Sequence, residues 1–315
     1  MLIGVDIGGT KCAVCLWEKQ KLIKKVKFPT ENKEKTLEKI ESTVSEFSKG
    51  SKIEAVGISC GGPLDSQKGV ILSPPNLSDW ERVPITELLS RCADAPAQLL
   101  NDANACALAE WKHGAGKGTE NMIFLTFGTG MGAGLILNGR LYEGANGMAG
   151  EIGHIRLREN GPVGYGKAGS VEGFCSGGGI AQIGKAAVTE AYRRGMSVDF
   201  CKESEIDFLN AKIIGDAAEA GDALAKEIYR KSAHHLGAVL AILIDVFNPQ
   251  AIVIGSIFSR SEALFREEME KVIKDEALPL AVKMCKICPS KLGEDIGDLA
   301  ARTIAEGIME KNTYV

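Results

Sequence analysis

Apolar and polar residues follow one another in the N-terminal part of the chain in an order that predicts strands, a helix and a further strand. Continuous or alternating apolar runs bounded by glycine or charged residues indicate strands, whereas apolar residues at helical spacing indicate an amphipathic helix. By these criteria we expect strands at 2–7, 11–17, 22–28 and 53–59, with a helix at 32–49.

The same order of elements returns further along the chain. Residues 121–144 predict a strand, a glycine turn and a strand, and residues 250–259 predict a buried strand that runs into a Gly-Ser turn. The apolar stretch 236–247 is too short to span a bilayer and contains Asp245, so it predicts a buried helix. Because ligand sites in α/β sheets lie beyond the carboxyl ends of strands, we expect a duplicated α/β protein with a cleft between two lobes.

Composition and charge narrow the class of protein. The chain has 315 residues, 45% hydrophobic and 25% charged, which is typical of a soluble globular protein of two domains. Its formal net charge of -4 gives no electrostatic reason to expect nucleic acid as a partner, and the lysine-rich stretch 19–28 predicts the solvent face of a strand. The sequence enters its first strand without a charged leader or an apolar signal core, so we expect a cytoplasmic protein with no membrane attachment.

Cysteine usage agrees with that expectation. The 9 cysteines are scattered along the chain, and without a signal peptide they predict reduced, mostly buried thiols. Cys285 and Cys288 match the C-x-x-C pattern. Because residues 281–288 alternate like a strand, a structural role is favoured over a metal or redox role, which stays open.

The turn after the first strand is the first candidate for chemistry. It can be an ordinary hairpin turn in which Gly8 and Gly9 adopt positive φ angles and Asp6 caps the turn. It can also be a phosphate loop, because consecutive backbone N–H groups without side chains bind anions. In that case Thr10 adds a hydroxyl and Asp6 can hold the metal ion that accompanies nucleotide phosphates.

Two further glycine turns occupy matching places. The segment 127–134 reads F-G-T-G-M-G-A-G between two predicted strands, and Gly255-Ser256 follows the buried strand near 250. A single glycine turn is a weak signal, but turns at matching positions in both halves favour nucleotide binding over ordinary hairpins.

The motifs GVDIGGTK, LLNDANACALAEWKHGAG, FLTFGTGMGAGLILNGRLYEGANGMAGEIGHI and IVIGS, in this order, resemble the ROK family of sugar kinases and related repressors, which have the actin/hexokinase-type ATPase fold. The resemblance covers nearly the whole chain. It implies ATP and Mg²⁺ as cofactors, with Asp6 at the metal either directly or through water. It implies phosphate contacts for Asp6, Gly8, Gly9, Thr10 and Lys11, and for Gly128, Thr129, Gly130 and Gly132, and it implies that Gly255 and Ser256 lie near the adenosine.

Asp102 is the candidate general base. Phosphoryl transfer to a sugar hydroxyl needs a carboxylate that accepts the hydroxyl proton. Asp102 follows an apolar run and precedes an alanine-rich helix that ends near Gly114, and a helix N-terminus favours an ionised carboxylate. Asn and Asp are also the commonest N-caps, so a purely structural role is the alternative. The resemblance to the family's N-D-A-N motif favours catalysis.

A set of polar residues can bind the hydroxyls of a sugar. Each of them alone can equally be a hydrogen-bonded residue of a loop or the core, but the family resemblance implies that all lie at the sugar pocket together with Asp102. They are Asn76, Asn101, Glu151, His154 and Glu172.

The sequence departs from the family after the E-x-G-H motif. The family pattern C-x-C-G-x-x-G-C-x-E provides three cysteines that bind zinc with the histidine, whereas this chain has Val163, Tyr165 and Ser170 at those positions, with Cys175 nearby. A closed structural zinc site needs four ligands, so we expect no zinc site. We expect Val163 and Tyr165 to pack inward instead, and Ser170 to bond locally to the backbone.

These observations predict an α/β, duplicated two-lobed actin/hexokinase-like (ribonuclease H-like) fold with a central cleft. We expect an N-terminal lobe of residues 1–116, completed by the C-terminal helix 297–315, and a C-terminal lobe of residues 117–296. The expected function is ATP-dependent phosphorylation of a hexose or hexose derivative, at its 6-hydroxyl, by a homodimer.

The alternative is a sugar-sensing transcriptional regulator of the same family that lacks kinase activity. Repressors of this kind carry a helix-turn-helix domain before the D-I-G-G-T strand, and we expect none here because only five residues precede Asp6. The sequence leaves open whether the sugar is a free hexose, an N-acetylated hexose or a β-glucoside.

Overall fold

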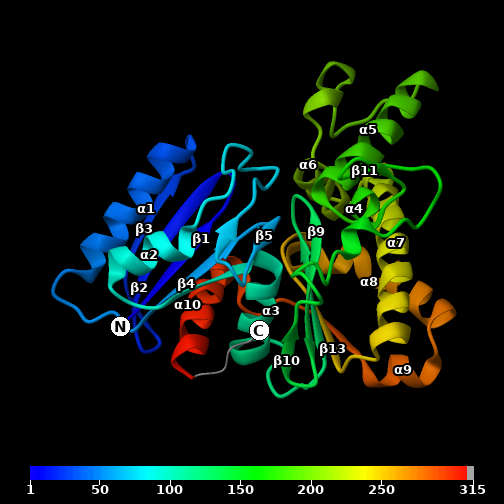
Figure 1. The fold of residues 1–315 in the computed structure, drawn as a ribbon. Coiled ribbons are helices and arrows are strands. Elements are labelled where there is room, and N and C mark those ends of the chain that lie inside the picture. Colours follow the sequence, from blue (N-terminus) through cyan, green and yellow to red (C-terminus); the bar gives the residue numbers. More distant parts are fainter. Residues whose placement is uncertain (311–315) are drawn as a thin grey trace. The chain divides into compact units, whose positions relative to one another are not determined.

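The computed structural model describes residues 1–310, apart from the side chain of Glu294 (Figure 1). The chain forms two compact units. The first comprises Met1–Phe124, Gly134–Ala149 and the segment from Lys291 onward, and the second comprises Leu125–Ala133 and Gly150–Ser290. The end of the predicted C-terminal helix, 311–315, lies outside the described residues. The lobe limits given above remain a prediction.

The N-terminal sheet has the strand order β3-β2-β1-β4-β7. Its strands are β1 (Leu2–Ile7), β2 (Lys11–Glu18), β3 (Lys21–Pro29), β4 (Ala55–Cys60) and β7 (Ala97–Asn101). The first three strands pair antiparallel, whereas β1, β4 and β7 pair parallel. The carboxyl ends of these three parallel strands therefore meet at one edge of the sheet.

Helices cover this sheet. They are α1 (Lys33–Ser48), α2 (Ile85–Ala93), α3 (Asp102–His113) and α10 (Ile296–Met309). The predicted helix at 32–49 is confirmed as α1, which buries a stripe containing Ile40, Val44 and Phe47, while the Asn32 side chain accepts the Lys35 N–H. At Gly57, a Cβ atom would lie 2.0 Å from the backbone oxygen of Ala301, so glycine is what lets α10 lie against β4.

The second sheet repeats the plan of the first. It has the order β10-β9-β8-β13-β14 and consists of β8 (Met122–Phe127), β9 (Met131–Leu137), β10 (Arg140–Tyr142), β13 (Ala251–Ile254) and β14 (Lys286–Pro289). Position by position, β8, β9 and β10 correspond to β1, β2 and β3, and β13 and β14 correspond to β4 and β7. The predicted duplication is confirmed at the level of strand order.

The remaining elements are mostly helices of the second unit. They are α4 (Val171–Phe174), α5 (Gly177–Arg193), α6 (Ala211–Glu219), α7 (Ala223–Phe247), α8 (Ile257–Glu276) and α9 (Pro279–Met284). Short elements are β5 (Leu64–Asp65) with β6 (Val70–Ile71), β11 (Val163–Gly164) with β12 (Lys167–Ala168), and the 3₁₀ helices η1 (Ile152–His154), η2 (Glu203–Phe208) and η3 (Gly293–Asp295). The predicted buried helix at 236–247 is the second half of α7, the long yellow helix of Figure 1.

The strand predicted for 281–288 is wrong in its first half. Pro279 lies in the first turn of α9, where a missing N–H needs no partner, and this helix continues to Met284. Only Lys286–Pro289 forms a strand, which pairs parallel with β13. The apolar alternation of 281–284 therefore belongs to a short helix. Among the described residues, neither Cys285 nor Cys288 forms a disulfide.

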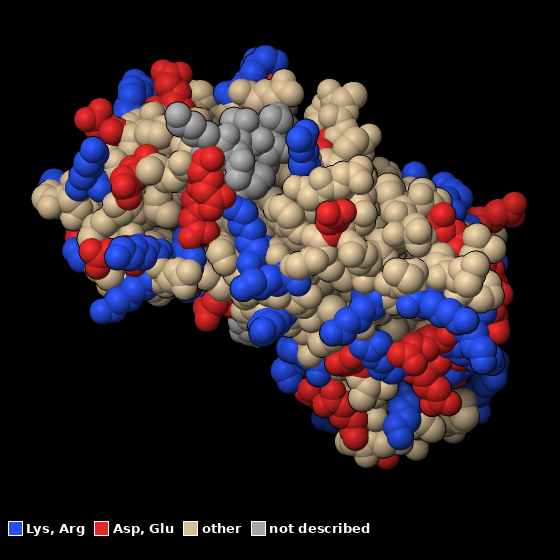
Figure 2. Space-filling view, turned by 90° about the horizontal axis from the view of Figure 1, so that it is seen from below, with Lys and Arg blue, Asp and Glu red and all other residues tan. Residues whose placement is uncertain are grey.

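The helices and the surface charges bear on whether a membrane or a nucleic acid is a partner. Among residues 1–310, every helix is too short or too polar to cross a lipid bilayer. On the face shown in Figure 2, basic and acidic side chains are interspersed rather than segregated by sign.

Candidate active site

The residues that follow the three parallel strands of the first sheet lie together. Asp6 lies near the end of β1, Gly61 follows β4, and Asp102 follows β7. A Cβ atom on Gly61 would lie 3.8 Å from Oδ2 of Asp102, and one on Gly62 would lie 3.3 Å from Nδ2 of Asn101. The strand edge that the topology forms thus brings the two predicted carboxylates to one place in the first unit.

The turn between β1 and β2 needs glycine because a side chain would not fit there, and not because the backbone adopts a positive φ angle. Neither Gly8 nor Gly9 adopts a positive φ angle. A Cβ atom on Gly9 would lie 2.3 Å from the Cβ of Asn76, so only glycine allows the predicted sugar residue to approach. The Gly8 N–H donates to the Lys11 carbonyl at 3.1 Å, which closes the hairpin, and Gly9, Thr10 and Lys11 are exposed.

Asp6 carries an unusual charge environment. Burial, followed by the nearby carboxylates of Asp102 and Asp298, raises the pKa of Asp6 to about 6, against the lowering effect of Lys11 and Lys25. Within residues 1–310, no hydrogen-bond donor of the protein reaches this carboxylate. A charged group in this state is stabilised by a cation, and Mg²⁺ prefers such carboxylate oxygens.

Helix α10 contributes to this environment, which the sequence motifs do not predict. A Cβ atom on Gly297 would lie 2.6 Å from Oδ2 of Asp6, so the first turn of α10 packs directly on that carboxylate. The next residue, Asp298, is buried and pairs with Lys25 of β3. The only signal in the sequence is the Gly-Asp pair at 297–298, and nothing local connects it to Asp6.

Asn101, not Asp102, is the N-cap of α3. The Asn101 side chain accepts the Ala103 N–H at 3.0 Å, and Oδ1 of Asp102 accepts the same N–H at 2.8 Å. Asp102 is therefore the first residue of the helix, which begins and ends where the sequence predicted. Asp102 is exposed as a residue. Protein atoms packed around its carboxyl group nevertheless withdraw that group from water and so raise its pKa, whereas hydrogen bonds from the backbone N–H groups of Ala103 and Asp102 lower it.

The glycine turn of the second unit holds Glu172. Oε2 of Glu172 accepts the Met131 N–H at 3.1 Å, and a Cβ atom on Gly130 would lie 2.6 Å from that oxygen. The turn itself is closed by the Gly128 N–H, which donates to the Gly130 carbonyl, while the Gly132 N–H donates to the Thr126 hydroxyl. The structure thus joins a predicted sugar residue to the predicted phosphate turn.

Ser256 has a strained backbone. It precedes α8 with φ 54° and ψ -115°, a conformation suited to glycine rather than serine. It lies next to the glycine turn, because a Cβ atom on Gly128 would lie 3.6 Å from the Ser256 hydroxyl oxygen. Residues with strained backbone angles are found more often at ligand-binding sites than elsewhere.

A glycine-rich helix start beside the same turn was also missed. The Ser176 side chain caps α5 by accepting the Gly179 N–H, and the Gly177 N–H donates to the Gly128 carbonyl at 2.8 Å. A helix N-terminus without side chains is well suited to anions. The sequence S-G-G-G at 176–179 is the signal that could have found it.

Glu151 and His154 lie on η1 and its N-terminal side, both exposed. Helix η1 packs against Glu172, because a Cβ atom on Gly153 would lie 3.4 Å from the Glu172 Cβ. The His154 ring makes an edge-on contact with Tyr165, with ring centroids 5.3 Å apart, and the His154 carbonyl accepts from the Lys167 ammonium at 2.7 Å. These contacts place the His154 ring beside Tyr165 and its backbone beside Lys167.

The expected packing of the residues that replace the family's cysteines is only partly right. Val163 and Tyr165 do not pack inward, since they are 48% and 64% exposed. Val163 is held by its backbone, and Tyr165 adopts a positive φ and packs on His154. Ser170 does bond locally, accepting the Gly173 N–H at 3.1 Å as the cap of α4. Cys175 is buried, with its thiol directed at the Ser232 carbonyl.

The described residues contain no group of three His, Cys, Asp or Glu side chains arranged to hold a metal ion. Mg²⁺ usually binds through one or two carboxylates together with substrate phosphates and water. The carboxylate of Asp6 fits that mode, because a cation would offset the burial, and the repulsion from Asp102, that raise the pKa of Asp6.

The two matching sheets, each with a glycine turn after its first strand, define the class of actin/hexokinase-like α/β proteins. A sequence model of the ROK family matches residues 2–307. The chain belongs to the ROK family, and the predicted family and fold class are confirmed.

Three relatives illustrate the range of the family. A glucokinase of Thermotoga maritima is 36% identical over 310 residues, covering 96% of each chain. A xylose repressor of Caldicellulosiruptor bescii is 30% identical over 83% of this chain and 66% of its own. The crystal structure of a ROK family glucokinase from Streptomyces griseus in complex with glucose and AMPPNP has a TM-score of 0.78 at 31% identity, covering 97% of this chain and 99% of that one.

Proposed function

We propose that the protein is an ATP-dependent hexose kinase, which transfers the γ-phosphoryl group of ATP to a hydroxyl of a hexose or hexose derivative. The observation that carries the proposal is the meeting of Asp6 and Asp102 at the carboxyl edge of the first sheet. Identity of 36% to a glucokinase over nearly the whole chain supports the same conclusion. The 6-hydroxyl is the proposed acceptor, on the basis of the family resemblance alone.

Asp102 is the proposed general base. Its Oδ1 is held by the N–H of Ala103, which leaves Oδ2, on the side of Gly61, to accept the proton of the sugar hydroxyl. Burial raises the pKa of Asp102, which strengthens the carboxylate as a proton acceptor, and a helix N-terminus favours the ionised form that accepts the proton.

Asp6 is the proposed holder of Mg²⁺, directly or through water. When bound, Mg²⁺ neutralises the charge of the nucleotide phosphates. The N–H groups of Gly9 in the first unit, and of Thr129 and Gly130 in the second, are the proposed phosphate donors, assisted by Thr10 and Lys11. The N–H groups of Gly8, Gly128 and Gly132 close the two turns, and the missing side chains of these glycines let a phosphate approach the backbone. Gly255 and Ser256 are proposed to lie at the adenosine, a role that the strained Ser256 backbone supports.

The proposed sugar ligands act through the hydrogen bonds that their side chains offer. In the first unit these are Asn76 and Asn101, and in the second Glu151, His154 and Glu172. The His154 ring contacts the ring of Tyr165, and we propose that it also contacts a sugar hydroxyl directly.

A sugar-sensing regulator is the second candidate, favoured by the 30% identity to a xylose repressor. The glucokinase relative is closer and matches over more of both chains, which favours the kinase. We further propose that the enzyme is a cytoplasmic homodimer without a nucleic-acid partner. The 9 cysteines, which form no disulfide among the described residues, support the cytoplasmic location. The interspersed charges on the face shown in Figure 2 support the absence of a nucleic-acid partner.

A coupled ADP-release assay against hexoses, N-acetylated hexoses and β-glucosides tests the proposal. We expect sugar-dependent ADP formation with at least one of them and a phosphorylated product in equal amount. Sugar binding without ADP formation across the panel would favour the regulator.

A further inference from the structure

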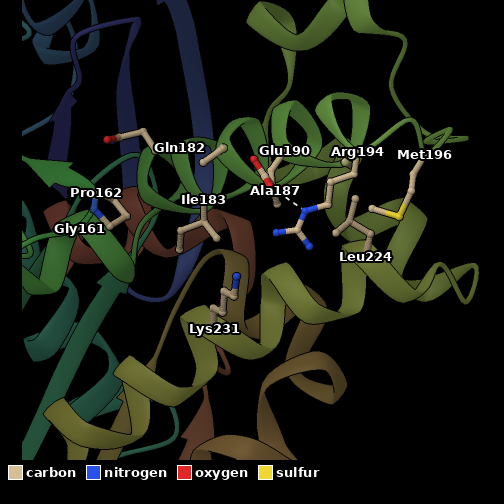
Figure 3. Close-up of a pocket in the computed structure, with 12 residues that line it drawn as sticks. Gly161, Pro162, Gln182, Ile183, Ala187, Glu190, Arg194, Met196, Leu224 and Lys231 are labelled. Carbon is tan, nitrogen blue, oxygen red and sulfur yellow. Dashed lines mark hydrogen bonds and ion pairs between the residues drawn. The ribbon is translucent and has the colours of Figure 1, made fainter.

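A groove of about 680 Å³ lies in the second unit, away from the residues assigned above (Figure 3). Ile183, Ala187 and Ala191 of α5 form its apolar wall, Leu224 of α7 lies opposite, and the segment Gly161–Pro162 lines one end. Its volume is that of a site for a small molecule.

Positive charge gathers in this groove. The Lys231 ammonium points into it from α7, and within residues 1–310 it forms no hydrogen bond and no ion pair (Figure 3). Glu190 accepts from the Nε of Arg194 at 2.7 Å and from Arg193 at 3.2 Å, so one carboxylate serves two guanidinium groups. The Nη groups of Arg194 stay available. An anion is therefore the complement of this groove.

We propose that the groove binds a small amphipathic anion, with an apolar body against Ile183 and Leu224 and a carboxylate or phosphate between Lys231 and Arg194. Ligand pockets commonly combine apolar walls with a few charged groups that fix orientation. The ammonium of Lys231 supplies the charge, and the short side chains of Ala187 and Ala191 leave room for the body.

The groove is connected to the segment that carries the proposed sugar residues. Gln182, which lines the groove, accepts the Val163 N–H and donates to the Val163 carbonyl, both at 2.8 Å. The next residue, Gly164, packs on α4, since its Cβ atom would lie 2.7 Å from the Cβ of Glu172. A ligand resting on Pro162 would hold this segment in place. This part of the inference rests on the proposed function, and it makes the anion an effector that tightens hexose binding.

The binding step is tested with the fluorescent anion 1-anilinonaphthalene-8-sulfonate on folded protein without nucleotide or sugar. We expect saturable binding at one site, competition by hexanoate and none by hexanol. Lys231→Glu reverses the charge of the groove and Ala187→Trp fills it, and each should weaken binding about fivefold or more. Lys226→Glu, an exposed position of α7 outside the groove, is the matched control and should bind as the native protein does. Equal affinity in all four proteins, or competition by hexanol, overturns the proposal.

The connection is tested by measuring hexose affinity calorimetrically with and without saturating hexanoate. We expect affinity to rise about fivefold in the native protein and to stay unchanged in Gln182→Ala, which retains the groove but lacks the two bonds to Val163. An equal rise in both proteins, or no rise in the native one, overturns the connection. If no hexose binds at all, the connection fails together with the proposed kinase, whereas the anion site is still decided by Lys231→Glu.

Discussion

Asp6 is partly buried beside two further carboxylates, those of Asp102 and Asp298, which a hairpin turn alone does not explain. Replacement of Asp6 by Ala removes the proposed Mg²⁺ ligand, so we expect the Mg²⁺ concentration for half-maximal rate to rise about tenfold or more. Sugar affinity measured without nucleotide should stay unchanged, because Asp6 is not assigned to the sugar. If the variant instead lost only thermal stability, with normal Mg²⁺ dependence, Asp6 would be a turn residue and no more.

Ser256 is the second residue whose local state demands an explanation. Its positive φ costs a serine about 1–3 kcal/mol, which glycine avoids, while glycine costs up to about 1 kcal/mol through the unfolded chain. Ser256→Gly should therefore raise the free energy of unfolding by about 1 kcal/mol in denaturant titrations. Ser197→Gly, in an exposed loop position without positive φ, is the matched control and should be neutral or slightly destabilising. A loss of stability in Ser256→Gly would mean that the serine hydroxyl outweighs the strain.

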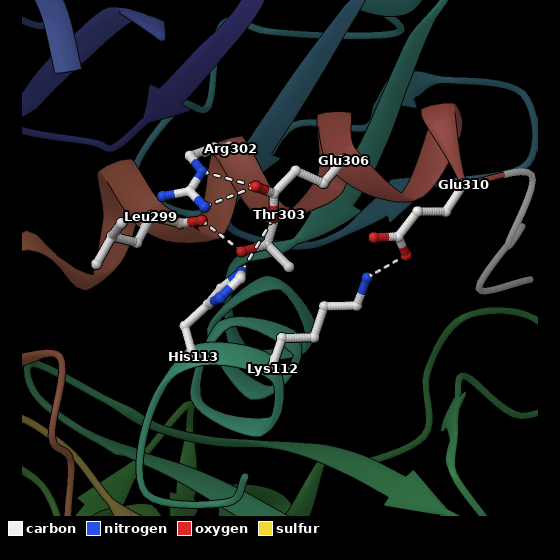
Figure 4. A network of polar contacts seen from close by, with 7 residues as sticks. All are labelled: Lys112, His113, Leu299, Arg302, Thr303, Glu306 and Glu310. Carbon is white, nitrogen blue, oxygen red and sulfur yellow. Dashed lines mark hydrogen bonds and ion pairs between the residues drawn. The ribbon is translucent and has the colours of Figure 1, made fainter. Parts of the chain in front are cut away.

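Helix α10 holds a buried polar network on its inner side (Figure 4). Arg302, only 4% exposed, donates from Nε at 2.8 Å and from Nη2 at 2.6 Å to Oε1 of Glu306, and His113 of α3 lies 3.0 Å from Oε2. Burial would raise the pKa of Glu306, but the hydrogen bonds from His113 and Arg302 lower it overall. A depressed folded-state pKa means that the carboxylate stabilises the fold above its ordinary pKa of 4.5 and ceases to do so as the pH falls through the folded value.

Glu306→Gln should thus lower the free energy of unfolding at pH 7 by about 2–3 kcal/mol, since it leaves a buried guanidinium without its carboxylate. The difference from the native protein should shrink as the pH falls below the ordinary glutamate pKa of 4.5 and through the lower folded-state pKa of Glu306. Denaturant titrations at several pH values measure it. Glu310→Gln, which affects a half-exposed carboxylate paired with Lys112, is the control and should cost less than about 1 kcal/mol. A pH-independent difference would contradict this assignment of Glu306.

Most of the elements could be predicted from the sequence because their signals are local. The limits of α3 follow from an N-cap at Asn101 and a glycine at its end, and the strand-turn-strand units follow from apolar runs around glycine. Residues 281–284 show the limit of such reasoning, because an alternating apolar pattern four residues long does not distinguish a strand from a short helix that Pro279 can start.

The site was predictable only as a set of residues, not as an arrangement. The motifs identify Asp6 and Asp102. The packing of Gly297 on Asp6, however, brings together residues from opposite ends of the sequence, and no local sequence pattern predicts such a contact. The same holds for Val163 and Tyr165, whose exposure follows from contacts of the backbone and of His154.

We expect the protein to hold the segment 151–172, which carries Glu151, His154 and Glu172, without zinc. The His154 ring contacts Tyr165, and Ser170 caps α4, so protein contacts hold this segment at both places. Elemental analysis of purified protein should find no stoichiometric zinc, and treatment with a chelator should not abolish activity once Mg²⁺ is resupplied. One equivalent of tightly held zinc would contradict this and would indicate His154 and Cys175 as ligands.

The central claim is that Asp102 takes the proton from the sugar hydroxyl during phosphoryl transfer from ATP. The most direct measurement compares Asp102→Asn with the native protein in steady-state ADP release and in sugar binding. The account predicts that the variant folds, binds the sugar, and turns over about 10²- to 10⁴-fold more slowly. Near-normal turnover by Asp102→Asn would contradict the account, because the amide cannot accept the proton.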